Sequence, residues 1–316
     1  MKRLDFLKQK SSGILYLKNI PVYDIENQRL LNKECAPGLL QKNASNESFK
    51  QWLKYRYSAN TNSFARVLKG VTFGQGNRVL IDKSTSILSL SDCYWIPNEE
   101  MEFEYCSPYF VDFWKGYTEY KGGSIPTLYA NGFLSKCWTS STELFKKGDT
   151  VKIEIECSRL VRLCNISCAE VLDDEDGIIV KNFTSSHVML ESADMSGKID
   201  PDDFDENTII ELFGLDGFRM IIIDAIFGNG DRHAGNFGFL RSADTGEYLS
   251  MAPLYDFDHA LDATGEKDRL LLDAIDIANA NEEYQKEAIR ISNSIVKETI
   301  NDVFRKRAIC VLKQCR

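Results

Sequence analysis

The feature that most constrains this chain is an apolar helix that ends in a glycine-rich loop carrying an acid and an amide. The apolar composition of residues 217–227 predicts a buried helix. The helix should end at 228–230, where two glycines accept the backbone reversal. Asp231 follows at once, and Asn236 comes five positions later. An acid that orients an attacking hydroxyl and an amide that binds magnesium are typical of a phosphoryl-transfer loop.

A second acid is expected to return to the same place. After Asn236, residues 237–240 predict a strand, residues 241–247 a polar hairpin, and residues 251–255 a second strand that ends at Asp256. This strand–hairpin–strand would bring the carboxylate of Asp256 beside Asn236. There it could bind magnesium that bridges the phosphates of ATP.

Three neighbouring residues admit more than one role. Asp258 lies two positions after Asp256 and is a rival for the metal. Arg232 and His233 follow Asp231 directly and are candidate catalytic residues, although a histidine at such a place more often positions the loop. Each acid or amide alone could be a turn or cap residue, but their order along the chain favours phosphoryl transfer.

The preceding region has the elements of a small nucleotide-clasping lobe. The pattern predicts strand, strand, helix, strand and strand, with the two hairpin strands at 133–138 and 143–146, the helix at 151–163, and the last strands on either side of an acidic turn at 173–177. Asp149 and Thr150 precede the helix and are its predicted cap.

A lobe of this kind needs a lysine on a strand and a glutamate on the following helix, whose ion pair directs the lysine toward the phosphates. Lys136 and Lys146 lie on the two predicted strands, and Glu154 and Glu156 lie on the predicted helix. Because exposed lysine and glutamate are common, the residues alone leave both choices open.

Charge and hydropathy exclude other classes of protein. The formal net charge of −9 argues against a general nucleic-acid binder, which would show a basic surplus. The most apolar windows, 220–227 and 270–275, are far too short to span a membrane, and no apolar stretch near the N-terminus has the length of a signal peptide. We therefore expect a cytoplasmic protein with no membrane contact.

The nine cysteines are expected to be thiols, because their number is odd and they form no dense framework. Cys157, Cys164 and Cys168 lie close together in an apolar stretch. They lack a CxxC pair or a nearby histidine, so we expect buried core residues rather than metal ligands.

The chain divides into three predicted regions. Residues 1–115 form an N-terminal region with early strands at 13–17 and 20–23 and a polar helix at about 46–68. Residues 116–195 form the nucleotide-clasping lobe. Residues 196–316 form a mainly helical region with the catalytic loop and the metal site, and its stretch 281–312 has helical, amphipathic spacing.

Residues 224–240, together with 252–256, strongly resemble the HipA-like kinases and look closest to their short branch of CtkA-type bacterial serine/threonine kinases. The resemblance covers about 123–261. It implies an α+β, two-lobed protein-kinase-like fold with a small β-rich N-lobe and a mainly helical C-lobe, preceded by 1–115 as an accessory region. It also implies ATP and Mg²⁺.

The resemblance assigns roles by motif. Asp231 is then the catalytic aspartate, and Asn236 and Asp256 are the metal ligands. Lys146 becomes the preferred phosphate lysine, and Glu154 becomes its preferred partner.

The nucleotide contacts follow the same resemblance. The segment Asn182-Phe183-Thr184 resembles the hinge that holds adenine. No glycine-rich loop of the kinase form is visible, so turns such as the one at Gly132 are what remains to cover the phosphates. At 256–258 the run is Asp-Phe-Asp, which lacks the glycine that protein kinases have there.

The expected activity is transfer of the γ-phosphate of ATP to a serine or threonine hydroxyl, on a protein or on the enzyme itself. The missing glycines leave an alternative, a catalytically weak or inactive nucleotide-binding regulatory module of kinase-like fold. HipA-type kinases often work with a small DNA-binding partner, so an antitoxin-like partner is a further expectation. The chain itself is not expected to bind nucleic acid directly.

Overall fold

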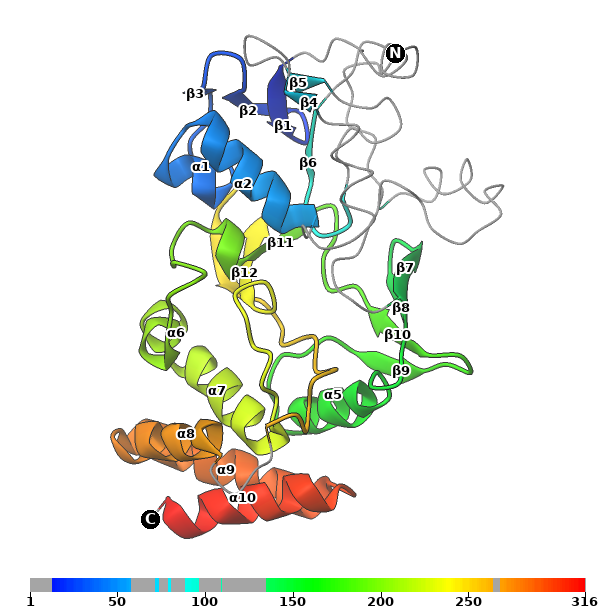
Figure 1. Cartoon of the computed structure of the whole chain (residues 1–316), viewed down its shortest axis with the longest axis vertical. Helices are drawn as coiled ribbons and strands as arrows, with labels where there is room; N and C mark the ends of the chain where they lie inside the picture. Colours follow the sequence, from blue (N-terminus) through cyan, green and yellow to red (C-terminus); the bar gives the residue numbers. More distant parts are fainter. Residues whose placement is uncertain are drawn as a thin grey trace. The chain divides into compact units, whose positions relative to one another are not determined.

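The computed structural model describes most of the chain and divides it into two compact units (Figure 1). The described residues are 13–57, 72–73, 79–80, 89–96, 109, 135–263 and 268–315. Unit 1 takes its described residues from the stretches 1–146, 182–198 and 238–250, and unit 2 takes its residues from 147–181, 199–237 and 251–316. The predicted division at 115 and 195 stays a prediction.

Unit 1 is built from small antiparallel sheets. In the first sheet the strand order is β3-β2-β1-β6, with β1 at Ile14–Leu17, β2 at Ile20–Asp24, β3 at Arg29–Leu30 and β6 at Tyr94–Trp95. Two short strands, β4 (Thr72–Phe73) and β5 (Val79–Leu80), pair separately. β7 (Ser135–Ser140) neighbours β8 (Glu143–Lys147). The early strands and the hairpin thus form where the alternating pattern predicts them.

A three-stranded sheet of unit 1 joins segments that are distant in the sequence. Its order is β11-β12-β13, with β11 at Val188–Ser192, β12 at Gly238–Ser242 and β13 at Tyr248–Met251. β11 and β12 are antiparallel, and Ser192 pairs with Gly238. A Cβ at Gly238 would lie 2.3 Å from the carbonyl oxygen of Glu191, so this pairing requires glycine two residues after Asn236.

One hydrophobic core binds these segments together. The helices α1 (Gly38–Lys42) and α2 (Asn46–Tyr57) cover it, and the short 3₁₀ turn η2 (Ala193–Met195) adds Met195. The Trp52 ring of α2 stacks on Phe49 with centroids 5.7 Å apart and meets Tyr94 edge-on at 5.5 Å. Met189 and Ala243 are buried in the same cluster. Residues before 97 therefore share a core with β11 and with the turn after β12.

Unit 2 is mainly helical and is centred on one buried helix (Figure 1). α7 (Leu215–Phe227) is buried along almost its whole length because its apolar residues face every side. It packs against α6 (Glu206–Phe213), α8 (Arg269–Asn279), α9 (Glu282–Glu298) and α10 (Asp302–Gln314). The unit also contains α5 (Ile153–Leu163) and the antiparallel hairpin of β9 (Val171–Asp173) and β10 (Ile178–Lys181).

Two local expectations are wrong, and a third is confirmed with more detail. The N-cap residue of α5 is Lys152, without a side-chain bond, so Asp149 and Thr150 do not cap it. The second strand after Asn236 lies at Tyr248–Met251 and not at 251–255, because pairing with β12 extends the hairpin over residues that look polar. The C-terminal stretch is helical as expected and forms two helices, separated where Asn301 caps α10 by accepting from Val303 and Phe304.

Other expectations are confirmed. The fold is mixed α and β, with small antiparallel sheets and helices. Cys157 and Cys164 are buried in the core, Cys168 is half-buried, and the seven cysteines whose side chains the structure describes are free thiols. None of the helices that the structure describes combines the length and the hydropathy of a transmembrane segment.

Candidate active site

The loop that carries Asp231 begins where the sequence predicts it, directly after α7. Gly228 follows α7 with a φ of 64°, in the left-handed region that glycine adopts without strain, and its N–H bonds the carbonyl oxygen of Asp224. The carbonyls at this helix end also accept bonds from a later segment. Leu261 N–H donates to Phe227 at 2.9 Å, and Ala263 N–H donates to Gly228 at 2.9 Å. The segment that follows Asp256 is therefore fixed to the start of the loop.

A buried arginine connects the two halves of the site. Arg232 Nε and Nη2 each lie 2.8 Å from an oxygen of Asp224, a carboxylate on α7 that is 2% exposed. Its Nη1 donates to the carbonyl oxygens of Asn236 at 2.7 Å and Tyr255 at 2.8 Å. Asn236 and the residue before Asp256 thus share one donor nitrogen. The predicted return of Asp256 to the neighbourhood of Asn236 follows from this bond pair.

The surroundings of Arg232 keep its guanidinium group protonated. Burial by itself would lower the pKa of the guanidinium, but the negative charge of Asp224 outweighs burial and the pKa is raised. The guanidinium also lies 5.1 Å from the centroid of the Phe257 ring. Arg232, which the motif placed among the catalytic residues, is thus enclosed by protein groups and suited to positioning the loop.

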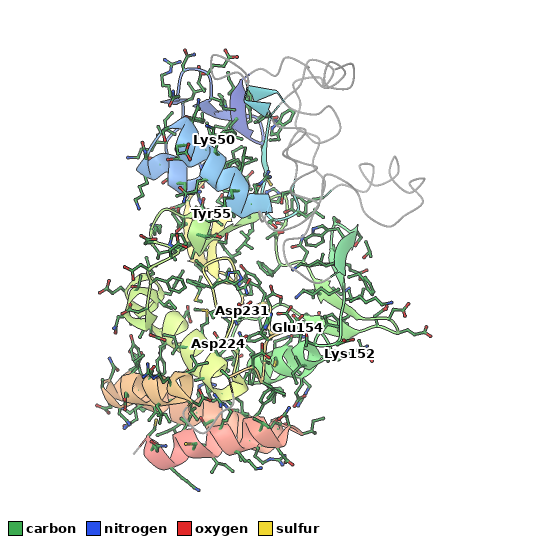
Figure 2. The ribbon with its side chains drawn as sticks, in the orientation of Figure 1. Lys50, Tyr55, Lys152, Glu154, Asp224 and Asp231 are labelled. Atoms are coloured by element: carbon green, nitrogen blue, oxygen red, sulfur yellow. The ribbon has the colours of Figure 1, made fainter. Side chains whose placement is uncertain are left out.

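Asp231 is half-exposed and has an imidazole on each side (Asp231 is labelled in Figure 2). His233 Nε2 lies 3.9 Å and His259 Nε2 lies 3.8 Å from Asp231 Oδ2. Gly235 N–H donates to His233 Nδ1 at 3.0 Å, so the neutral ring of His233 carries its proton on Nε2, toward Asp231. Asn236 Nδ2 donates to the Asp231 carbonyl oxygen at 3.2 Å, which leaves the amide oxygen of Asn236 for a cation.

His259 was not among the residues predicted from the sequence. Its Nδ1 lies 2.6 Å from Asp262 Oδ2, and this bond, with smaller contributions from Asp231 and Asp258, raises the pKa of the imidazole. The only signal in the sequence was a histidine directly after the Asp-Phe-Asp run at 256–258. A histidine near acids is too common to identify a site without the fold.

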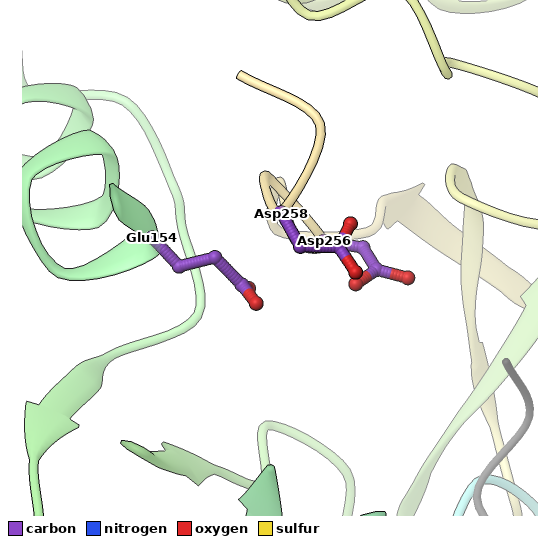
Figure 3. A group of neighbouring side chains, drawn as sticks. All are labelled: Glu154, Asp256 and Asp258. Carbon is purple, nitrogen blue, oxygen red and sulfur yellow. The ribbon is translucent and has the colours of Figure 1, made fainter. Parts of the chain in front are cut away.

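Three carboxylates converge in unit 2. Figure 3 shows the side chain of Glu154 extending from α5 toward Asp256 and Asp258. One carboxylate oxygen from each residue lies within 4.8 Å of the others, and Glu154 is 1% exposed. Negative charges at this separation repel one another unless a cation or proton intervenes. Oxygen donors of this kind fit Mg²⁺, and Asp258, the predicted rival for the metal, belongs to the group.

The backbone of Asp256 supports a special role for this residue. Its φ is 62°, in the left-handed region that few residues other than glycine adopt. Aspartate and asparagine tolerate this region better than most side chains, because a short polar group bonds locally. The left-handed conformation of Asp256 therefore fixes the direction of its carboxylate. Residues in this conformation are frequent at functional sites.

The predicted nucleotide residues lie in unit 1. Lys146 is on β8 and is 4% exposed. Asn182, Phe183 and Thr184 lie between β10 and β11, and Thr184 is 8% exposed. Gly132 lies outside the described residues. The roles of these residues in binding ATP stay predictions, as does the ion pair expected for Lys146.

Comparison with known proteins gives matches of three kinds. Residues 132–309 match the sequence profile described as the HipA-like C-terminal domain. Over 58 residues the chain is 41% identical to the serine/threonine-protein kinase CtkA of Helicobacter pylori strain J99. That match covers 18% of this chain and only 17% of the length of that protein.

Two solved structures are similar. A crystal structure of the Helicobacter pylori proinflammatory kinase CtkA aligns with a TM-score of 0.40 at 16% identity, covering 58% of this chain and 91% of that chain. A chain from the Shewanella oneidensis MR-1 toxin–antitoxin complex of HipA, HipB and operator DNA aligns with a TM-score of 0.53 at 12% identity, covering 96% of both chains. The second similarity extends over nearly the whole chain and confirms the expected HipA-type fold.

Proposed function

Because the chain belongs to the family of HipA-like C-terminal domains, we propose that it is a kinase that transfers the γ-phosphate of ATP to a serine or threonine hydroxyl. The acceptor is a protein or the enzyme itself. The observation that carries the proposal is the set of Asp231, Asn236 and Asp256, in which Arg232 bonds the backbone beside both candidate metal ligands. The segment that is 41% identical to a serine/threonine kinase supports the same chemistry.

The mechanism assigns one task to each side chain. Asp231 accepts a hydrogen bond from the attacking hydroxyl, orients its oxygen and takes its proton as the new O–P bond forms, while the bond from the γ-phosphorus to the β,γ-bridging oxygen breaks and ADP leaves. The Nε2–H of His233 and the imidazole of His259, whose pKa is raised, give the Asp231 carboxylate an electropositive surrounding. Arg232 and His233 position the loop rather than touch the reacting atoms.

The oxygen donors would hold magnesium. Asn236 and Asp256 are the proposed ligands, and Glu154 and Asp258 offer further carboxylate oxygens beside Asp256. When bound, the ion neutralises charge on the phosphates and on the group that is transferred. Glu154 is also the proposed partner of Lys146, and a carboxylate has enough oxygens to serve both.

The remaining contacts concern the nucleotide. Lys146 would bind the α- and β-phosphates, the segment 182–184 would hold the adenine, and the turn at Gly132 would cover the phosphates. We place this activity in the cytoplasm.

The partner is proposed from the fold. The similar Shewanella oneidensis structure is a complex of HipA with HipB and operator DNA. A small DNA-binding protein is therefore a candidate partner of this chain, which would meet DNA through that partner. Purification from the native host should then recover a small helix-turn-helix protein in a fixed ratio, and recovery of the chain without one would count against the partner.

The activity is tested with γ-labelled ATP and Mg²⁺. The wild-type protein should become labelled or label an added protein, and Asp231→Ala should lower the rate about 100- to 10,000-fold. Asp216→Asn is the matched control, because Asp216 is an exposed aspartate in the first turn of α7 that pairs with Arg219. Full activity of Asp231→Ala would refute the assignment. Absence of label, with ATP still raising the melting temperature, would favour a nucleotide-binding module without turnover.

A further inference from the structure

The carbonyl oxygen of Leu90 is the centre of a buried hydrogen-bond network. Leu90 is 1% exposed, and it lies in the region that the sequence sets apart as accessory. Three side chains approach its oxygen as donors: Thr184 Oγ1 at 2.5 Å, Tyr109 Oη at 2.8 Å and Asn182 Nδ2 at 3.3 Å. Two of the three belong to the segment that is proposed to hold adenine.

The Thr184 hydroxyl has one hydrogen and three acceptors within reach, which are the Leu90 carbonyl oxygen, Asn182 Oδ1 at 2.7 Å and the Tyr109 hydroxyl. Asn182 Nδ2 has two hydrogens, and its acceptors are the carbonyl oxygens of Leu90 and, at 3.0 Å, Ser141. Asn182 Oδ1 accepts from Thr184 N–H at 3.0 Å. The hydroxyls of Thr184 and Tyr109 lie 3.0 Å apart, so one can donate to the other while the other donates to Leu90.

These bonds change what the segment 182–184 can offer a ligand. The polar side-chain atoms of Asn182 and Thr184 are engaged with protein acceptors and donors, and Thr184 is buried. A buried polar group that gives up such a bond loses more free energy than a new exposed bond returns. Recognition of a base by this segment therefore falls to its backbone, whose position the network sets.

The backbone on both sides of the segment is also held within unit 1. Asn182 N–H donates to the carbonyl of Thr142 at 2.9 Å, in the turn between β7 and β8. Further along, Leu190 N–H on β11 donates to the carbonyl of Ser91 at 2.7 Å. Ser91, the residue after Leu90, thus bonds the strand that follows the segment 182–184.

We propose that residues 89–91 are a positioning element of the nucleotide site, and that Thr184 and Tyr109 transmit their position to the backbone that contacts adenine. The inference rests on the proposed function, because it takes 182–184 to be the adenine-binding segment. It gives the N-terminal region a role in nucleotide affinity and makes Thr184 a positioning residue that does not touch the ligand.

The test uses the full chain and measures binding of ADP by calorimetry. Thr184→Val removes the hydroxyl at nearly constant volume and should weaken ADP binding about 3- to 10-fold, since one buried hydrogen bond is lost. Tyr109→Phe should weaken ADP binding by a smaller factor. Thr184→Ser keeps the hydroxyl and should restore the affinity. Thr139→Val is the matched control, because Thr139 Oγ1 bonds the Glu143 carbonyl on the exposed β7–β8 hairpin.

The ligand series separates this role from a general loss of structure. Adenosine should lose affinity as ADP does, whereas tripolyphosphate and Mn²⁺ should bind the wild type and Thr184→Val equally. Wild-type affinity for ADP in Thr184→Val, or an equal loss for tripolyphosphate, would overturn the inference. If the wild type binds no adenine nucleotide, the proposed function fails and this inference fails with it. That result is distinct from wild-type binding that the substitution leaves unchanged.

Discussion

Each unit contains a buried arginine that pairs with a carboxylate and donates to backbone carbonyls. The two arginines differ in which part of the backbone they hold. Arg241 of unit 1 is fully buried, bonds Glu191 Oε1 at 2.8 Å, and donates to the carbonyls of Glu34 and Gly246 at 2.8 Å each. Arg232 of unit 2 is likewise buried, is paired with one carboxylate, and bonds two carbonyl oxygens. In both, an always-charged planar group satisfies backbone acceptors that water cannot reach.

The difference lies in which backbone each arginine holds. The carbonyls bonded by Arg241 belong to the N-terminal region and to the turn after β12, so Arg241 assembles unit 1 from distant stretches. Glu191, its partner, also accepts from Gly38 N–H at 2.8 Å and from the Tyr248 hydroxyl at 2.6 Å. Arg232 instead bonds residues at or beside the candidate metal ligands. The same pairing therefore serves assembly in one unit and the geometry of a site in the other.

The largest expected effect is the loss of stability in Glu191→Ala. Removal of the carboxylate leaves Arg241 charged and buried without its partner, which typically costs about 3–5 kcal/mol. Urea denaturation should show this as a lower midpoint. Glu191→Gln keeps hydrogen-bond acceptors at the same place and should lose less. A Glu191→Ala variant as stable as the wild type would show that the Arg241–Glu191 pair does not stabilise unit 1.

Arg232→Lys should distinguish the role of Arg232 from that of Arg241. A lysine cannot bond both oxygens of Asp224 and two carbonyls at once, so we expect a loss of about 1–2 kcal/mol in stability. It should also weaken Mn²⁺ binding about 10-fold, measured by electron paramagnetic resonance, because the backbone beside Asn236 and Asp256 is no longer held.

Arg241→Lys is the matched variant for that experiment. It should lose at least as much stability as Arg232→Lys while the folded protein binds Mn²⁺ as the wild type does. Equal losses of Mn²⁺ affinity in the two variants would show that the two pairs do not differ in function.

The smallest effect should come from a carboxylate on α9 whose two arginine partners are partly exposed. Hydrogen bonds from Arg290 and Arg219 lower the pKa of Glu287 from 4.5 to about 2, although burial opposes the shift. The folded pKa lies below the unfolded one, so the stabilisation is present above about pH 4.5 and is lost as the pH falls toward 2. Glu287→Gln should therefore cost up to about 1 kcal/mol at pH 7 and progressively less below pH 4.5. A difference from the wild type that does not shrink in acid would contradict the shift.

The features that were predicted correctly are those determined by residues close together in the sequence. The apolar run before Gly228 and the glycine itself determine where α7 ends, so the place of Asp231 followed from local rules. The β7–β8 hairpin and the helix with Glu154 also appear close to their predicted bounds. By contrast, β13 is an edge strand of half-exposed and exposed residues that pairs only because β12 lies beside it.

The rest of the site depends on contacts between distant residues. Nothing in the chain around Asp224 indicates that it will bind Arg232, since an aspartate within an apolar helix has many possible partners. The grouping of Glu154 with Asp258 requires α5 to face the segment after Asp256, which no local pattern specifies. The acceptor at Leu90 is a backbone carbonyl, which every residue has, so its role has no signature in the sequence.

The stretches of the two units alternate along the chain, which affects how the protein folds and whether it can be split into fragments. Each unit draws on three separate stretches, so unit 1 is incomplete until residues 238–250 have been synthesised, although most of it precedes residue 147. Pairing of this kind joins residues that are far apart in the sequence, and such contacts slow folding. The early segments stay unpaired until the late ones have been synthesised. A fragment that stops at the end of the N-terminal region would keep its first sheet but lack Met189, Met195 and Ala243 of the shared core. Split versions of the protein should therefore recover activity only where both pieces are present from the start of folding.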